Sequence, residues 1–148
     1  IFFARGVLET VKKLRWAPDV IHCQGWISQV LPLYLKKVYV DDPIFSNSKI
    51  VLSMYDDTPA EFPADFKDKI LIPGVTEKDV EILTEPSGIN LAKLAVSYSD
   101  GIIYGSADVP EEIKTFCKDA GLPVLPFNAE AIKDGSYIDD YNSFYDQL

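Results

Sequence analysis

Apolar residues recur along this chain with two different periods. Between residues 2 and 15 they lie three or four positions apart with charged residues between them, which predicts an amphipathic helix. The run at 49–54 is instead short and almost continuously apolar, as strands are when both faces of their sheet are buried. Residues 19–24 are rich in Val and Ile and predict another short strand. The chain therefore alternates between helices and buried strands.

Proline and glycine mark the limits of the remaining elements. Prolines punctuate residues 55–75, so we expect a long loop there, with one short extended piece at 70–72. Pro32 falls inside a helical pattern and predicts a kink. The expected helices cover 2–15, 27–38, 76–83, 89–99, 111–117 and part of the tail, and the expected strands cover 19–24, 49–54, 101–104 and 123–127.

Several helix ends carry recognisable signals. Thr76 and Asp79 have the spacing of a capping box, with Asp in place of the usual Glu or Gln. Ser106 or Asp108 can cap the helix over 111–117, and Gly121 can close it. One stripe of aromatic and apolar residues predicts that the tail is a helix docked on the body: Tyr137, Tyr141, Phe144, Tyr145 and Leu148.

Strands that alternate with helices are typical of a parallel sheet. We therefore predict an α/β fold with an open, mostly parallel, doubly wound (Rossmann-like) sheet and helices on both faces. No linker interrupts residues 1–148, so we expect a single domain in which 128–148 is a C-terminal docking helix. Such sheets bind ligands beyond the carboxyl ends of their strands, where the strand order reverses.

Composition narrows the possible partners. With 148 residues, 47% of them hydrophobic, the chain can bury one core. The net charge of −9, with 14 scattered Lys and Arg, argues against nucleic acid and anionic membrane surfaces. No apolar run is long enough for a membrane span, and two cysteines without ligand spacing imply neither a metal site nor a disulfide framework. We expect a cytoplasmic protein, and the chain begins as if an upstream part were missing.

The strand ends carry the candidate chemistry. His22, Gln24 and Trp26 follow or end the first strand, and Tyr55 and Asp56 follow the second. Neither glycine-rich phosphate motif occurs, nor does a G-x-S-x-G elbow, and we expect no cofactor.

Structural roles remain open for several of these side chains. His22 can be a partly buried histidine bonded to the backbone, and Gln24 can cap the next helix. Trp26 can be a core anchor at the start of the next helix instead of a platform on which a ligand stacks. Asp56 and Asp57 would suit a receiver domain that binds Mg²⁺ and accepts phosphate, but such a site needs further acids at the first strand end. The first strand instead ends in Gln24 and Gly25. We therefore favour a turn with helix- or loop-capping aspartates.

Residues 18–26 (PDVIHCQGW) and 31–36 (LPLYLK) resemble the segment P-D-[IV]-[IV]-H-x-H-D-W…L-P-x-Y-L-K of starch and glycogen synthases, glycosyltransferase family 5. Residues 90–106 are similar to the family's N-x-x-K-x-[AG]-x-x-Y-A-D-x-V-x-x-V-S stretch, and Glu112 follows at the family's spacing. The resemblance covers most of residues 1–127 and is strengthened because the patterns occur in the family's order.

The resemblance implies one Rossmann-like lobe of a two-lobed glycosyltransferase B fold. The family moves glucose from ADP-glucose, or a related nucleotide sugar, onto an α-1,4-glucan with retention. The chain matches the later part of the N-terminal lobe, and its end resembles short single-lobe relatives. By resemblance, the sugar-binding positions are His22, Gln24, Trp26, Tyr55 and Asp56.

Departures from the family motif bear on activity. Gln24 stands where the family has its second histidine, and an amide cannot change its protonation state near neutral pH. Gly25 replaces the acid that follows. We therefore expect a synthase-like domain that is inactive by itself, with α-glucan and nucleotide sugar as partners. The alternative is a catalytically silent module that binds glucan or a protein, either another protein or a second copy.

Overall fold

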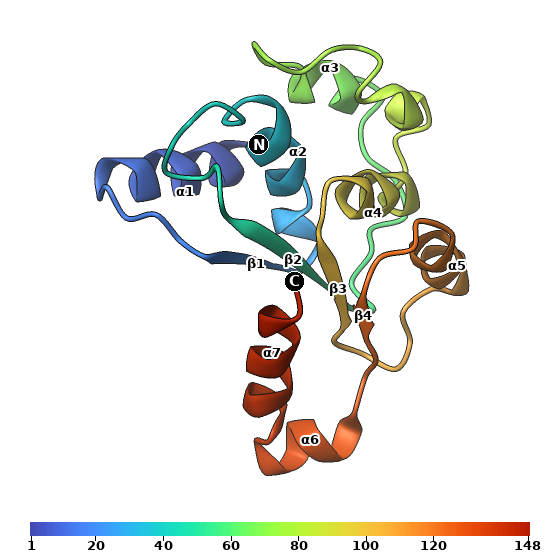
Figure 1. The fold of residues 1–148 in the computed structure, drawn as a ribbon. Coiled ribbons are helices and arrows are strands. Elements are labelled where there is room, and N and C mark those ends of the chain that lie inside the picture. The colour runs from blue at the N-terminus through green and yellow to red at the C-terminus, as the bar shows by residue number, and fades with distance from the viewer.

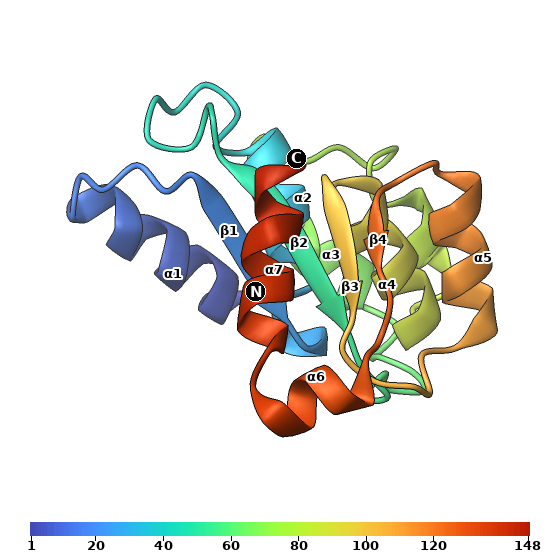
Figure 2. The same ribbon diagram turned by 60° about the horizontal axis from the view of Figure 1, so that its bottom comes forward.

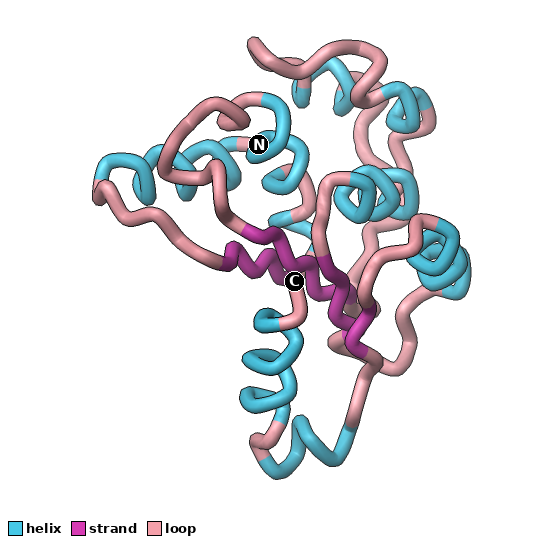
Figure 3. Tube along the Cα trace, in the orientation of Figure 1, coloured by secondary structure: helices cyan, strands magenta, loops and turns pink.

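The computed structural model describes all residues 1–148 and contains one four-stranded sheet flanked by helices (Figures 1 and 3). The elements in chain order are α1 (Phe2–Lys13), β1 (Val20–Gln24), the 3₁₀ turn η1 (Trp26–Ser28), α2 (Leu31–Lys37), β2 (Lys49–Met54), α3 (Phe66–Ile70), the 3₁₀ turn η2 (Glu81–Thr84), α4 (Gly88–Ser97), β3 (Gly101–Tyr104), α5 (Glu111–Asp119), β4 (Val124–Leu125), α6 (Ala129–Asp134) and α7 (Tyr137–Asp146).

The strands lie in the order β1-β2-β3-β4, and every neighbouring pair is parallel. The predicted open parallel α/β sheet is thus confirmed. The expected reversal of strand order does not occur among these four strands, because each crossover places the next strand on the same side of the last. The candidate site is therefore located by the carboxyl ends of the strands alone.

The two faces of the sheet are covered unequally. The strand connections put α2, α4 and α5 on one face together with α1, and Figures 1 and 2 show α7 crossing the other. The first face holds a core of 26 buried residues, which includes Ile50 and Leu52 of β2. The second holds only Val51, Ile103 and Phe144 as buried hydrophobic residues. Side chains of β2 alternate between these cores because successive residues of a strand point to opposite faces.

Pro32 does not kink a long helix, because two shorter elements occupy 27–38. The turn η1 ends at Ser28, and α2 starts at Leu31 with Pro32 in its first turn. Proline is favoured at this position because the first amide groups of a helix lack partners inside it. The proline therefore starts a helix where we expected it to bend one.

Two expectations for residues 66–84 are wrong. Residues 66–70 form the helix α3, whereas we expected an extended piece at 70–72. The capping-box bonds do form, since Asp79 Oδ2 accepts from the Thr76 amide at 2.9 Å, but they close a turn. Within the expected helix over 76–83, the only helical element is the 3₁₀ turn η2, which begins at Glu81.

The later elements agree with the sequence except at their caps and in the tail, where we expected one helix over 128–148. Pro110 stands at the start of α5 without a side-chain cap, and the Ser106 hydroxyl instead accepts from the Asp108 amide. Gly121 follows α5 with a φ of 68°, as a closing glycine does. The tail forms two helices, separated at Gly135 with a φ of 86°. None of the helices combines the length and apolarity needed to cross a membrane.

Candidate functional site

The carboxyl ends of β1 and β2 are joined by a hydrogen bond. Asp57 Oδ2 accepts from the Trp26 backbone amide at 3.1 Å. Gly25 precedes this bond with a φ of 75°, and a Cβ added there would lie 3.1 Å from the same carboxylate oxygen. The left-handed backbone and the close carboxylate both favour glycine at this position. Asp57 thus has a structural role at the strand ends.

His22 lies on the sheet face that α7 covers. Its Nε2 is 2.6 Å from Ser53 Oγ, and its Nδ1 is 2.7 Å from the Tyr145 hydroxyl. The rings of Tyr141 and Tyr145 stand edge-on to the imidazole, with centroids at 5.6 and 5.8 Å. Burial lowers the pKa of His22 from 6.5 to about 4, because the charged form loses hydration. The imidazole is therefore neutral at physiological pH, and its polar partners are side chains rather than backbone.

Gln24 is exposed at the end of β1 and lines a groove of about 560 Å³. Phe3 and Val7 of α1 form one wall, and Ile27 of η1 contributes to the other. The groove is mainly apolar and runs beside β1, which is the edge strand of the sheet. His22 also contributes to its lining. Two of the predicted sugar positions thus border one concave surface.

Trp26 belongs to an aromatic group that the sequence analysis did not identify. Its ring centroid lies 5.8 Å from that of Phe62, which is stacked on Phe66 at 4.3 Å. Phe62 also lines a depression of about 560 Å³, together with Glu61 and Glu85. Half-buried aromatic rings beside carboxylates can pack against the C–H face of a sugar and accept its hydroxyl protons. The sequence offered little indication of this group, because Phe62 and Phe66 lie in residues 55–75, which the prolines mark as a loop without a regular period.

Tyr55 and Asp56 lie at the end of β2 but face different surroundings. The Tyr55 ring packs on Gly105, where an added Cβ would be 2.3 Å from its Cε1 atom. Gly105 in turn donates its amide to the Met54 carbonyl at 2.8 Å, which holds the two strand ends together. Asp56 is exposed. The five predicted positions therefore share one edge of the sheet without converging on one point.

No group of three or more His, Cys, Asp or Glu side chains is arranged to hold a metal ion. Burial raises the pKa of the Cys23 thiol to about 12 and also raises that of Cys117, so both thiols stay protonated. The chemistry available at this edge is hydrogen bonding by amide, carboxylate and phenol groups together with aromatic packing. These groups suit the binding of a polyhydroxylated ligand.

Starch synthase catalytic domains match residues 1–124, which include β1, β2, β3 and the start of β4. The chain belongs to this family. The resemblance seen in the motifs at residues 18–26 and 90–106 is thereby confirmed, and with it the synthase-type Rossmann-like fold. No solved structure matches the chain significantly.

Glycogen synthases are among the similar curated proteins. That of Clostridium perfringens (strain 13 / Type A) is 33% identical over 156 residues, covering 99% of this chain and 32% of the relative. That of Clostridium botulinum (strain Eklund 17B / Type B) is 35% identical over 120 residues, covering 77% of this chain and 24% of the relative. That of Chlorobium limicola is 50% identical over 56 residues, covering 38% of this chain and 12% of the relative. The chain therefore spans about a third of the length of the Clostridium perfringens relative.

Proposed function

We propose that this chain is the sugar-binding part of a glycogen or starch synthase-type glucosyltransferase. In the complete protein, glucose would pass from ADP-glucose or a related nucleotide sugar to the end of an α-1,4-glucan. The match to starch synthase catalytic domains over residues 1–124 carries this proposal. The hydrogen-bonding and aromatic groups at the carboxyl edge of the sheet support it, because they suit sugar hydroxyls and sugar C–H faces.

Gln24 and Trp26 are the side chains we propose to contact sugar. Gln24 is exposed on a groove, and its amide can both donate to and accept from a hydroxyl. Trp26 extends the aromatic group of Phe62 and Phe66. Tyr55 and Asp56 border the same edge and complete the proposed set. His22 lies on the sheet face covered by α7, where its ring nitrogens contact the hydroxyl groups of Ser53 and Tyr145.

By itself the chain is expected to bind glucan without transferring glucose. Transfer from a nucleotide sugar needs groups that stabilise the departing diphosphate and groups that change protonation state. At the strand end an amide, Gln24, occupies the position of the family's second histidine. The His22 imidazole has both nitrogens engaged by Ser53 and Tyr145. Neither Gln24 nor the engaged His22 imidazole is therefore suited to proton transfer.

The test measures transfer of labelled glucose from ADP-glucose to glycogen by the full-length protein and by residues 1–148. We expect incorporation by the full-length protein and none by the shorter chain. Gln24→Ala should weaken binding of maltoheptaose to residues 1–148 by about five- to tenfold, because a hydrogen bond to sugar is lost. Lys118→Ala, an exposed change on α5, is the matched control. Incorporation of labelled glucose by residues 1–148 would contradict the proposal that this chain binds glucan without transferring glucose.

A silent glucan-binding protein is the second candidate. The engagement of both His22 nitrogens beneath α7 favours it, because neither nitrogen is free to exchange a proton with substrate. In this case the full-length protein would be retained on glycogen without incorporating glucose. A Gln24→His variant would then bind glycogen as well as the wild type and remain inactive. Turnover by the wild-type protein excludes this candidate.

A further inference from the structure

The turn that follows β1 begins without a cap of its own. Gly25 stands directly before η1 and offers no side chain, and the first amides of a helical turn have no partner inside it. Aspartate is among the residues preferred at this position, because its carboxylate accepts from such amides. The family pattern has an acid here, whereas this chain has glycine. The Trp26 amide therefore takes its acceptor from another part of the chain.

Asp57 supplies that acceptor from the segment after β2. Its Oδ2 atom accepts from the Trp26 amide at 3.1 Å. A Cβ added to Gly25 would lie 3.1 Å from the same oxygen. The Asp57 carboxylate thus occupies the space into which a side chain at position 25 would extend. Only one of the two positions can place a carboxylate there without a close contact between like charges.

The origin of the carboxylate decides what the hydrogen bond connects. An acid within the turn would bond locally, whereas Asp57 lies 31 residues after Trp26. Its bond is the only side-chain hydrogen bond that joins residues 25–28 to residues 55–62. The Trp26 ring also packs against Phe62, with the ring centroids 5.8 Å apart. The bond and the aromatic contact therefore hold the two strand-end segments against each other.

The proposed sugar contacts all come from these two strand ends. Gln24 and Trp26 lie at the end of β1, and Tyr55 and Asp56 follow β2. Each of the four lies within two residues of one partner of the hydrogen bond. A ligand that contacts both segments binds more tightly when their relative position is set beforehand, because less conformational freedom is lost on binding.

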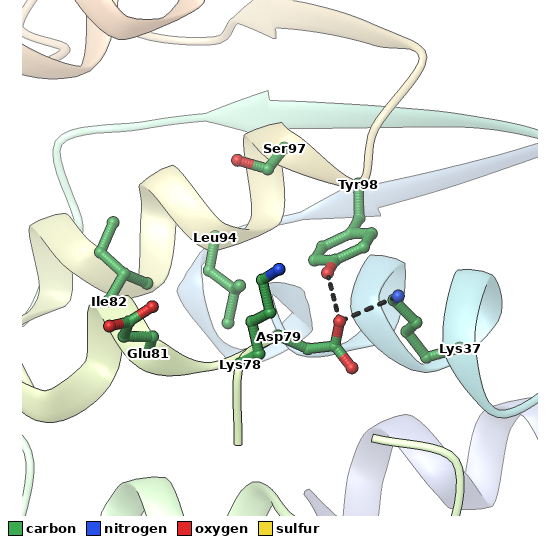
Figure 4. A pocket seen from close by; sticks show the side chains of 8 residues that line it. All are labelled: Lys37, Lys78, Asp79, Glu81, Ile82, Leu94, Ser97 and Tyr98. Carbon is green, nitrogen blue, oxygen red and sulfur yellow. Dashed lines mark hydrogen bonds and ion pairs between the residues drawn. The ribbon is translucent and has the colours of Figure 1, made fainter. Parts of the chain in front are cut away.

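A second aspartate joins separate parts of the chain far from these positions. In the pocket of Figure 4, the Asp79 carboxylate is 2.9 Å from Lys37 Nζ at the end of α2 and 3.4 Å from the hydroxyl of Tyr98, which lies three residues before β3. Bonds from Lys37 and Thr76 lower the pKa of Asp79 to about 2. Because both helix ends lie where strands begin, Asp79 stabilises the opposite edge of the sheet. It serves as the comparison for a purely structural carboxylate.

We propose that Asp57 is a positioning residue for sugar binding, and that its carboxylate replaces the acid of the family pattern at position 25. The identity of the ligand, an α-1,4-glucan, rests on the proposed function. Asp57 acts through the Trp26 amide and does not itself contact the sugar. A carboxylate thus stands at the start of η1, but it is attached to the segment after β2.

The test is calorimetric titration of residues 1–148 with maltoheptaose. Asp57→Ala should weaken binding about three- to tenfold, because the hydrogen bond to Trp26 is lost. Its melting temperature should change little, since the bond is exposed. Asp57→Asn keeps an oxygen that can accept from the amide and should restore most of the affinity. Asp79→Asn is the comparison and should lower the melting temperature without changing the affinity.

A double-mutant cycle tests the exchange of carboxylates. Gly25→Asp should weaken binding, because two carboxylates would meet at the start of η1. Gly25→Asp/Asp57→Ala leaves a single carboxylate, at position 25, and should bind about three- to tenfold more tightly than Gly25→Asp, because contacting residues that share a role are not additive.

The indole of Trp26 reports the position of the turn without any ligand. The chain has two tryptophans, and Trp16 is 63% exposed, so a Trp16→Phe background leaves Trp26 as the only emitter. In this background Asp57→Ala should shift the emission to longer wavelength and increase quenching by acrylamide. Asp57→Asn should do neither.

Wild-type affinity in Asp57→Ala, additive losses in the cycle or an unchanged Trp26 emission would each overturn the proposal. It would also be overturned if Asp57→Ala lowered the melting temperature as much as Asp79→Asn and Asp57→Asn restored no affinity, because the role of Asp57 would then be purely structural. The proposed function fails separately, when wild-type residues 1–148 bind no maltoheptaose and the full-length protein transfers no glucose. The Trp26 emission tests the positioning role in that case too, since it needs no sugar.

Discussion

At the residue scale, the sequence around His22 predicts its place in a strand but not the partners of its side chain. The run that contains His22 predicts a strand end, and β1 places it there. Its partners come from elsewhere, since Tyr145 lies 123 residues away in sequence. Gln24 follows two positions later and is exposed. Which of the two side chains meets solvent depends on what α7 covers, and no pattern within β1 contains that information.

The pH dependence of stability tests the environment of His22. Because its pKa falls from 6.5 to about 4 on folding, the unfolded chain binds more protons between these values. The free energy of unfolding should therefore decrease as the pH falls from 7 to 5, by about 1 to 2 kcal/mol from this group. Urea unfolding of the wild type and of His22→Asn at both pH values measures the difference. Equal losses in the two proteins would contradict it.

Gly25 offers a second test at this scale. Its φ of 75° and the nearby Asp57 carboxylate disfavour any side chain, so Gly25→Ala should lower the free energy of unfolding by about 1 to 3 kcal/mol. Gly25→Asp, which restores the family's acid, should cost more because two carboxylates would meet. Gly6→Ala is the matched control, since no atom lies within 4 Å of its added Cβ. In a helix interior that change should stabilise by about 0.5 to 1 kcal/mol.

At the scale of elements, the amphipathic helix α7 packs on the sheet through a small hydrophobic contact. The aromatic stripe of the tail predicts a docked helix, and Phe144 of α7 is 4% exposed against Val51 and Ile103. Gly101 makes the close approach possible, because an added Cβ there would lie 3.0 Å from the Phe144 ring. The hydrophobic contact is small compared with the core on the other face. We therefore expect α7 to be the first element to detach.

Phe144→Ala should lower the free energy of unfolding by about 3 kcal/mol, because a buried ring is replaced by a cavity. Protease cleavage should then begin in residues 128–148, before the parallel sheet unfolds. Ile138→Ala on the same helix is the control, since Ile138 is 55% exposed and should change stability by less than about 0.5 kcal/mol. Simultaneous cleavage throughout the chain would show that α7 and the sheet unfold together.

At the scale of the whole molecule, acidic residues outnumber basic ones. The chain carries 23 acidic and 14 basic residues. Each of its ion pairs has at least one side chain that is 36% or more exposed, and in Lys69 with Asp65, at 2.9 Å, both are 57% exposed. Such pairs contribute little each. Repulsion among the surplus carboxylates therefore outweighs them at low ionic strength.

Raising NaCl from 50 to 500 mM should increase the thermal midpoint by about 2 to 4 °C, because salt screens this repulsion. Differential scanning calorimetry at pH 7 measures the change. Potassium chloride at the same ionic strengths is the control and should give the same increase. A lower midpoint in salt would show that the ion pairs dominate.

The sequence alone determined the alternation of helices and strands, the parallel sheet, the docked tail and the family. These follow from local periodicity and from motifs whose residues are close together, as in residues 18–26. Only the tertiary structure decided the consecutive strand order, the burial of His22 and the stacking of Phe62 on Phe66. Each of these joins residues that are distant in sequence or lie in irregular segments. Their contacts arise from packing of the whole chain, which no local period encodes.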